Sequence, residues 1–450
     1  MCLLFFAIPI EHKYDKLFRF YSLTLLPEGL VLPHFFDKKI FFYLSDLAVW
    51  GLFGWMVIQK RSLFKRETLL LSLFLFLGLQ SIFCSSLFNY PIIYIHFFQF
   101  LTPFLLFLFL ANGPIKKEPL FKATSWSLFA ASCLQSVFAL CQYFSQSSLG
   151  LRLLNEHPLT ATIFVPNGRR SFLDLFSDRI AENHEIYRAI GTLSHANLLG
   201  GILVVGLLFT TMLLWRHPKQ RKWLAPAYFL QLSALGTTYS RSAIFAYILG
   251  TALWFFWMRN RSLRSSLRIP FLIFLSSLIV GGFFFWEQYL YRGGIVNYPA
   301  FTAASDLERL SFQNIAIRML ADHPLIGVGF EQFSLHASSL STGNLTLMTK
   351  GTVHNIYLLI AVEMGLLALL VFLIWIGVIL RNAVKNRSST EVKILLSLFL
   401  GLLFIGCCDF YLITCQQGRL IFFGIAGLLA RFSISQSSRE AADATQAAQD

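Results

Sequence analysis

The sequence predicts an all-α polytopic membrane protein with about twelve transmembrane helices and two large loops on one side of the membrane. Three observations indicate this fold class. The 450 residues are 56% hydrophobic and only 13% charged, and several windows of about 18 residues, long enough to cross a bilayer, carry no charge. Loops between these windows are alternately short and basic. Two of the remaining loops are long.

Apolar runs place the helices in order along the chain. The first run is interrupted by Pro27, Glu28 and Pro33 and has the least defined ends. The later runs are continuous and end in polar or basic residues. The expected spans cover residues 18–33, 41–58, 68–85, 92–111, 123–145, 197–215, 223–238, 241–258, 270–288, 354–380, 394–410 and 415–431.

Five short loops, near residues 60–66, 116–122, 216–222, 259–268 and 381–393, are rich in lysine and arginine. By the positive-inside rule they are cytoplasmic, and each falls where strict alternation of the spans requires a cytoplasmic loop. Both termini are then cytoplasmic, and residues 433–450 form a polar tail. The formal net charge of +14 is therefore an orientation signal, and no nucleic acid is expected as a partner.

Loops on the outer face differ in length and divide the chain into segments. Two are large, at residues 146–196 and 290–353, and both contain aromatic residues, glycine and proline in a mixture that can fold. They separate N-terminal spans (1–145), central spans (197–289) and C-terminal spans (354–432). We therefore expect the functional site on the outer face.

Neither the cysteines nor the glycines indicate a cofactor. Seven cysteines lie mostly inside apolar runs, which is typical of small packing residues. No nucleotide-binding glycine motif is present. The closest approach to an acidic metal-binding pair is Asp306-Leu307-Glu308, but the same residues make an ordinary helix start, so no metal is expected.

Four short polar clusters stand at outer helix ends or in outer loops. They are the stretches EIYRAIGTLSHANLLGG, TTYSRSAIFAYILG, SDLERLSFQNIAIRMLADHPLIGVGFEQF and GTVHNIYLLIAVEMG. Their polar members of interest are Arg188, His195, Asn197, Arg241, Arg309, Arg318, His354, Asn355 and Glu363.

The third cluster has the pattern of a short amphipathic helix at the membrane surface. Ser305 and Glu308 form a capping-box pattern that predicts its start. We expect Arg309 in the first turn, on a face different from the apolar stripe. The helix should end at His323-Pro324, and the glycines of the following GVG then permit a tight turn.

In the fourth cluster, His354 and Glu363 cannot share one small site. Nine residues on a helix place them about 180° apart around it and roughly 13 Å apart along it. His354 and Asn355 stand at the outer end, where water and headgroups reach them. Glu363 lies deeper, where an ionisable side chain has to face the bundle interior and be paired.

Most of these candidates also have an ordinary structural explanation. Arg241 could anchor its helix at the headgroups, and Arg309 and Arg318 could form the solvated face of a surface helix. A capping role is the alternative for His195, Asn197, His354 and Asn355. A functional role is favoured because four clusters converge on one face of one membrane.

These clusters, in this order, resemble the O-antigen ligase family of bacterial surface-polysaccharide assembly. The resemblance is best over residues 185–370, where RAIGTLSHAN, TYSRSA, DHPLIGVGF and HNIYLLIAVEMG stand in the family's order. It implies a GT-C-like membrane glycosyltransferase bundle that works without metal or cofactor and inverts the transferred sugar. It also implies a periplasmic site in the inner membrane, where a glycan moves from undecaprenyl diphosphate to the lipid A-core acceptor.

The family's usual functional residues correspond to Arg241, Arg309 and His354, which the resemblance implies are catalytic. Arg188 is a fourth basic candidate, and we expect it to bind substrate together with His195, Asn197, Asn355 and Arg318. The chemistry of these side chains agrees, because arginine can hold a diphosphate leaving group and histidine can accept a hydroxyl proton.

Two rivals stay open. A polysaccharide polymerase of the same superfamily would use carrier-linked chains as both donor and acceptor. A transporter or flippase should place ionisable groups near the bilayer midplane, whereas most candidates here lie at the outer end.

Overall fold

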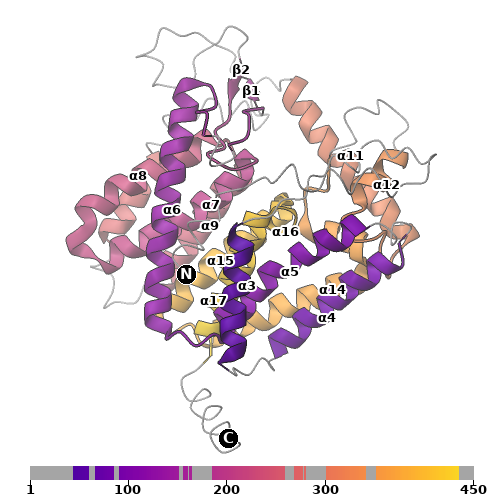
Figure 1. The fold of residues 1–450 in the computed structure, drawn as a ribbon. Coiled ribbons are helices and arrows are strands. Elements are labelled where there is room, and N and C mark those ends of the chain that lie inside the picture. The colour runs from indigo at the N-terminus through magenta and orange to yellow at the C-terminus, as the bar shows by residue number, and fades with distance from the viewer. Residues whose placement is uncertain are drawn as a thin grey trace, which may run out of the picture.

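The structure, a computed structural model, is mostly helical (Figure 1). It describes residues 44–59, 66–85, 91–151, 156–160, 162–164, 185–258, 268–276, 278–279, 300–340 and 351–434. Its helices are α3 (Leu44–Ile58), α4 (Arg66–Phe83), α5 (Pro91–Asn112), α6 (Lys117–Ser145), α7 (Ala196–Arg216), η3 (Pro218–Gln220), α8 (Arg221–Thr237), α9 (Arg241–Trp257), α11 (Ala300–Asp322), α12 (Phe333–Leu340), α14 (Ile356–Lys385), α15 (Thr390–Cys408), α16 (Tyr411–Thr414) and α17 (Gln416–Phe432).

Six of the described helices are long and apolar enough to cross a membrane, namely α4, α5, α6, α7, α14 and α15. The apolar stretches Asp46–Ile58 and Arg241–Trp257 are shorter, and α8 and α17 have 17 residues each. The chain is therefore a polytopic, mostly helical membrane protein. The expected span at 18–33 and much of the one at 270–288 lie outside the described residues, so a total of about twelve stays a prediction.

The exposed side of α14 supports a lipid environment. Leu366, Leu370 and Leu373 recur at helical spacing and are each at least 44% exposed. In water such a stripe would be costly, whereas hydrocarbon solvates it.

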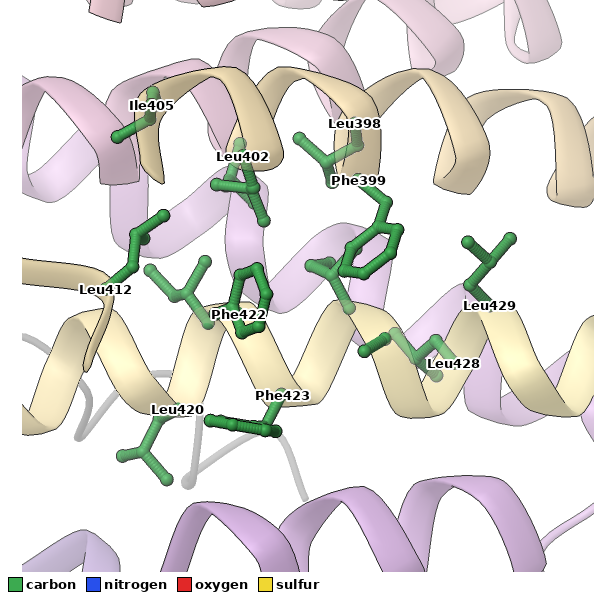
Figure 2. Packing of buried hydrophobic residues seen from close by; sticks show 14 of the residues in the cluster. Leu398, Phe399, Leu402, Ile405, Leu412, Leu420, Phe422, Phe423, Leu428 and Leu429 are labelled. Atoms are coloured by element: carbon green, nitrogen blue, oxygen red, sulfur yellow. The ribbon is translucent and has the colours of Figure 1, made fainter. Parts of the chain in front are cut away.

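Aromatic side chains fill the space between the helices. In Figure 2, Phe422 of α17 points toward α15, where its ring centroid lies 5.5 Å from that of Phe399. The adjacent Phe423 points the other way and lies 4.5 Å from Phe104 of α5. Helix α17 thus packs between α5 and α15, and α15 in turn packs on α9.

The loop between α6 and α7 contains the only strands in the described part of the chain. Strands β1 (Thr162–Phe164) and β2 (Glu185–Tyr187) pair antiparallel, with Ile163 opposite Ile186. The expected all-α class therefore holds for the bundle but not for this loop. Figure 1 shows this sheet and the helices α11 and α12 at the same end of the molecule.

Helix α11 begins earlier than the capping-box pattern predicts. It starts at Ala300, so Ser305 lies inside the helix and Arg309 falls in the third turn, not the first. The reason is that the run Ala-Phe-Thr-Ala-Ala after Pro299 is itself compatible with helix. The expected end is correct, since α11 stops at Asp322. Its apolar stripe, including Phe312, Ala316 and Met319, is buried as predicted.

The turn that follows α11 packs against a kink in α14 at Gly365. Gly365 has φ 87° and ψ 166°, a backbone conformation essentially restricted to glycine. The turn binds the opened helix through Val328 N–H to the Val362 carbonyl (2.8 Å) and Leu366 N–H to the Pro324 carbonyl (2.8 Å). This junction fixes α11 against the N-terminal part of α14.

Candidate functional site

A pocket of about 310 Å³ opens where α7 and α9 begin and α15 ends, beside Arg309 of α11. Its polar lining includes two arginines from different segments, Arg241 and Arg309, together with Asn197. Phe245 and Phe404 supply apolar walls. Two of the predicted catalytic residues, 68 positions apart in the sequence, are thus brought to one cavity.

Arg241 is positioned by a tight turn between α8 and α9. It is the first residue of α9, after the N-cap Ser240. The preceding Tyr239 has φ 48°, which is uncommon for a residue with a side chain, and it is fully buried. Its hydroxyl lies 3.1 Å from that of Tyr143 in α6. The buried side chain of Tyr239 therefore stabilises the turn. The start of α9 adds its partial positive charge to that of Arg241.

Arg309 reaches the pocket from α11. The apolar stripe of that helix packs against α14, which leaves Arg309 half-buried on another face. Its charge acts on neighbouring groups at this end of the bundle, among them the Asp409 carboxyl and the His354 imidazole. Arg309 therefore sits where an incoming anion would meet a positive potential.

Behind the pocket lies a buried hydrogen-bonded chain of three side chains. The Arg188 guanidinium donates to Asn197 Oδ1 (2.5 Å), and Asn197 Nδ2 donates to Asp409 Oδ2 (2.5 Å). Arg188 also donates from Nε to the Thr238 carbonyl (2.7 Å) in the turn before Arg241. All three side chains are at most 5% exposed. These hydrogen bonds thus connect α7, the end of α15 and the α8–α9 turn.

Asp409 follows the last residue of α15 and is 1% exposed. Burial raises the pKa of its carboxyl above the usual value. The positive charge of Arg309 and the hydrogen bonds from Phe410 N–H and Asn197 act in the opposite direction. The pKa of the Asp409 carboxyl is therefore set by opposing effects of burial and of its neighbours, as is common for acidic groups in functional sites.

His354 lies beside this network, one residue before the N-cap of α14. Its ring packs edge-on against Phe410, with centroids 4.9 Å apart. Burial, and then the charge of Arg309, lower the pKa of His354 from 6.5 to about 4. Its Nδ1 atom is buried and has no hydrogen-bond partner among the described residues. His354 therefore presents a neutral, buried ring nitrogen near Arg309 but does not line the pocket that contains Arg241 and Arg309.

Other predicted residues fall into structural positions. Asn355 caps α14, because its Oδ1 accepts from the Tyr357 and Leu358 amides. His195 caps α7, because its Nδ1 atom accepts a hydrogen bond from the backbone N–H of Asn197 (3.1 Å). Arg318 is exposed and, nine residues from Arg309, lies on the opposite side of α11. The structure therefore does not bring Arg318 to the pocket.

Glu363 and Arg188 are also accounted for by contacts within the protein. Glu363 Oε1 accepts from the Phe333 amide (3.2 Å), which agrees with the predicted bonding role inside the bundle. Arg188 does not line the pocket, so it supports Asn197 and the α8–α9 turn from behind.

Sequence reasoning missed Asp409 and Tyr239. An acidic residue at the outer end of the 394–410 run meets the same criterion that singled out Glu363, so that signal was present. The left-handed conformation of Tyr239 has no sequence signal, because it is imposed by packing.

The helices and the cationic pocket define a polytopic membrane protein with a candidate anion-binding site at one end of its bundle. Residues 226–373 match the family model described as O-Antigen ligase, the family that the sequence motifs resemble. The matched segment includes Arg241, Arg309 and His354, whereas Arg188, Asn197 and Asp409 lie outside it. No curated protein matches the chain. Proteins of this family act in general on lipid-linked glycans and lipid acceptors.

Proposed function

We propose that this protein transfers a glycan from undecaprenyl diphosphate to the lipid A-core oligosaccharide at the periplasmic face of the bacterial inner membrane. The observation that carries the proposal is the convergence of Arg241 and Arg309 on one pocket at the end of the helices. The family match over both residues supports it. The expected orientation, with both termini and the basic loops in the cytoplasm, belongs to the same proposal.

In this reaction an acceptor hydroxyl oxygen attacks the anomeric carbon, and the bond from that carbon to the carrier diphosphate breaks. The electron pair of the broken bond stays on the diphosphate, whose growing charge Arg241 and Arg309 would stabilise by bidentate hydrogen bonds. Attack from the face opposite the leaving group inverts the anomeric centre. In this proposal the two arginines take the role that a divalent metal plays in other transferases.

The hydroxyl proton would pass to His354. A ring with a pKa of about 4 is a weak base while the site is empty. A bound diphosphate would place negative charge beside Arg309 and offset the effect of Arg309 on the imidazole, which would raise the pKa of His354 from its value in the empty site. His354 would then be neutral before substrate binds and more basic afterwards.

A polysaccharide polymerase of the same superfamily is the second candidate, since the family match supports both activities. Deletion of the gene followed by gel analysis of the lipopolysaccharide separates them. Loss of the polymer ladder with an intact core supports ligation, and a ladder reduced to a single repeat supports polymerisation. A transporter is disfavoured because the pocket that contains Arg241 and Arg309 lies at the ends of α7, α9 and α15, away from the middle of these helices.

A further inference from the structure

A second pocket, of about 410 Å³, lies at the other end of the bundle. It is formed by the start of α6, the end of α7, the start of α15 and the end of α17. Helices α7 and α15 also contribute, at their opposite ends, to the pocket that contains Arg241 and Arg309. The 21 residues of α7 span about 30 Å, the thickness of the hydrocarbon core. The two pockets therefore face opposite membrane surfaces.

Cationic groups from two helices meet in this second pocket. Lys122 comes from α6 and Arg216 from the last turn of α7, and the charges of both reach His217. Arg216 pairs with Glu391 of α15 at 3.0 Å. Lys122 is exposed and has no carboxylate partner within the part of the chain that the structure describes. The pocket lining also includes Lys117 and Glu118, so its three cations, Lys117, Lys122 and Arg216, outnumber its two carboxylates, Glu118 and Glu391.

The pKa of His217 reflects the positive charges around it. Its pKa is lowered from the ordinary value of 6.5, first by burial and then by the charges of Arg216 and Lys122. Like charges that are close enough to disfavour protonation of a third group are repulsive, and a bound anion would relieve that repulsion.

The walls of the pocket are apolar and aromatic. The Trp126 ring lies 5.6 Å from that of His217, and Phe121 and Leu213 form the deeper lining. Tryptophan is characteristic of the membrane interface, where its ring meets both lipid and water. The site therefore combines cations at its mouth with an apolar interior, between helices that are long enough to span a bilayer.

We propose that this pocket binds the phosphate group of an anionic phospholipid from the leaflet opposite the glycan-transfer site. Basic loops near a membrane are expected from the positive-inside rule alone. What distinguishes Lys122 and Arg216 is that they converge on a cavity with a lipid-compatible wall. A soluble phosphate would make the same contacts with the cations but would leave that wall unused, which is why a lipid is favoured.

The test uses the full-length protein in nanodiscs of phosphatidylcholine with increasing phosphatidylglycerol, with retained lipids counted by native mass spectrometry. Lys122→Gln and Arg216→Gln should each weaken phosphatidylglycerol retention about five-fold, since one cation near a membrane surface contributes on that order. Lys122→Arg should retain it. Lys219→Gln is the matched control, because this exposed lysine lies in η3 at the same face and does not line the pocket.

Three outcomes would overturn the proposal. One is equal phosphatidylglycerol retention by the Lys122→Gln, Arg216→Gln and Lys219→Gln proteins. Another is equal retention of phosphatidylcholine and phosphatidylglycerol by the wild type. The third is displacement of the lipid by millimolar inorganic phosphate, which would indicate a site for a soluble anion. Lys122→Gln is informative even if Arg216→Gln unfolds, because Lys122 contributes no ion pair to the described fold.

Discussion

Asn197 donates a 2.5 Å hydrogen bond to Asp409, although the two residues are 212 positions apart in the sequence. Asn197 stands at the start of α7 and Asp409 directly follows α15, so this bond joins two membrane-spanning helices immediately behind the pocket. Removing the side-chain amide of Asn197 leaves the buried Asp409 carboxyl with one hydrogen-bond donor fewer.

We expect Asn197→Ala to lower the free energy of unfolding by about 1–3 kcal/mol, the usual cost of an unsatisfied buried polar group. Asp409→Asn combined with Asn197→Ala should cost less than the sum of the single changes, since the partners are coupled. Thermal unfolding of the four proteins in one detergent measures the coupling. Strictly additive losses would contradict a direct bond.

Arg309→Ala should reduce glycan transfer about 10²- to 10³-fold, because a charge-stabilising donor to the leaving group would be lost. Arg241→Ala should do the same, and lysine at either position should restore activity only in part, since it lacks the planar fork of donors. Transfer is followed by the gel shift of the lipid A-core acceptor.

Arg318→Ala is the matched control, because Arg318 is an exposed arginine on the same helix as Arg309. The activity of this variant should stay near that of the wild type. Similar loss in all three alanine variants would point to a general electrostatic effect.

His354→Asn should lower transfer by about 10²- to 10⁴-fold, the typical contribution of a positioned base. Asparagine keeps a small polar side chain but has no basic nitrogen, so normal accumulation with lost activity would indicate a role in proton transfer. Asn355→Ser is the control, since serine also caps a helix and should preserve turnover. An active His354→Asn protein would move the search for the base to another residue.

The low pKa of His354 also predicts a pH dependence of stability. Because its pKa is about 4 in the folded protein and near 6.5 when unfolded, the unfolded chain binds more protons between these values. The corresponding stability is fully present above about pH 6.5 and is lost as the pH falls toward 4. The unfolding midpoint of the wild type should therefore drop more between pH 7.5 and pH 5 than that of His354→Asn. Parallel decreases would mean that His354 titrates normally.

Gly365→Ala should destabilise the protein and displace the turn that follows α11. An added Cβ would overlap the Leu325 carbonyl, and the backbone angles at this position are essentially restricted to glycine. Gly377→Ala in the same helix is the control, because nothing lies within 4 Å of its Cβ position and alanine favours helix. We expect lower thermal stability and activity only for Gly365→Ala, and equal behaviour of the two variants would contradict the kink.

The proposed orientation predicts which positions an impermeant thiol reagent reaches. In a protein without its native cysteines, a cysteine at Thr160 should be labelled from outside intact inner-membrane spheroplasts. A cysteine at Lys219 should be labelled only after permeabilisation. Labelling of position 219 from outside would reverse the topology and with it the location of the transfer site.

The sequence alone determined features that depend on local physics. Long uncharged runs predict membrane helices, and the structure shows six helices of sufficient length and hydropathy within its described residues. Helix ends were predicted where short polar residues precede an apolar run, as at Asn355, which caps α14. The start of α11 was predicted wrongly, because a capping-box pattern and an uninterrupted helix have similar local sequences there.

Only the tertiary structure decided which polar residues meet. The sequence predicted roles for both Arg309 and Arg318, and the packing of α11 on α14 is what turns Arg309 toward the pocket and leaves Arg318 exposed. Asp409 becomes part of the site only because α15 ends beside the start of α7. The physical reason is that hydropathy and capping act over one or two helical turns, whereas the partner of a buried charge is set by how whole helices pack.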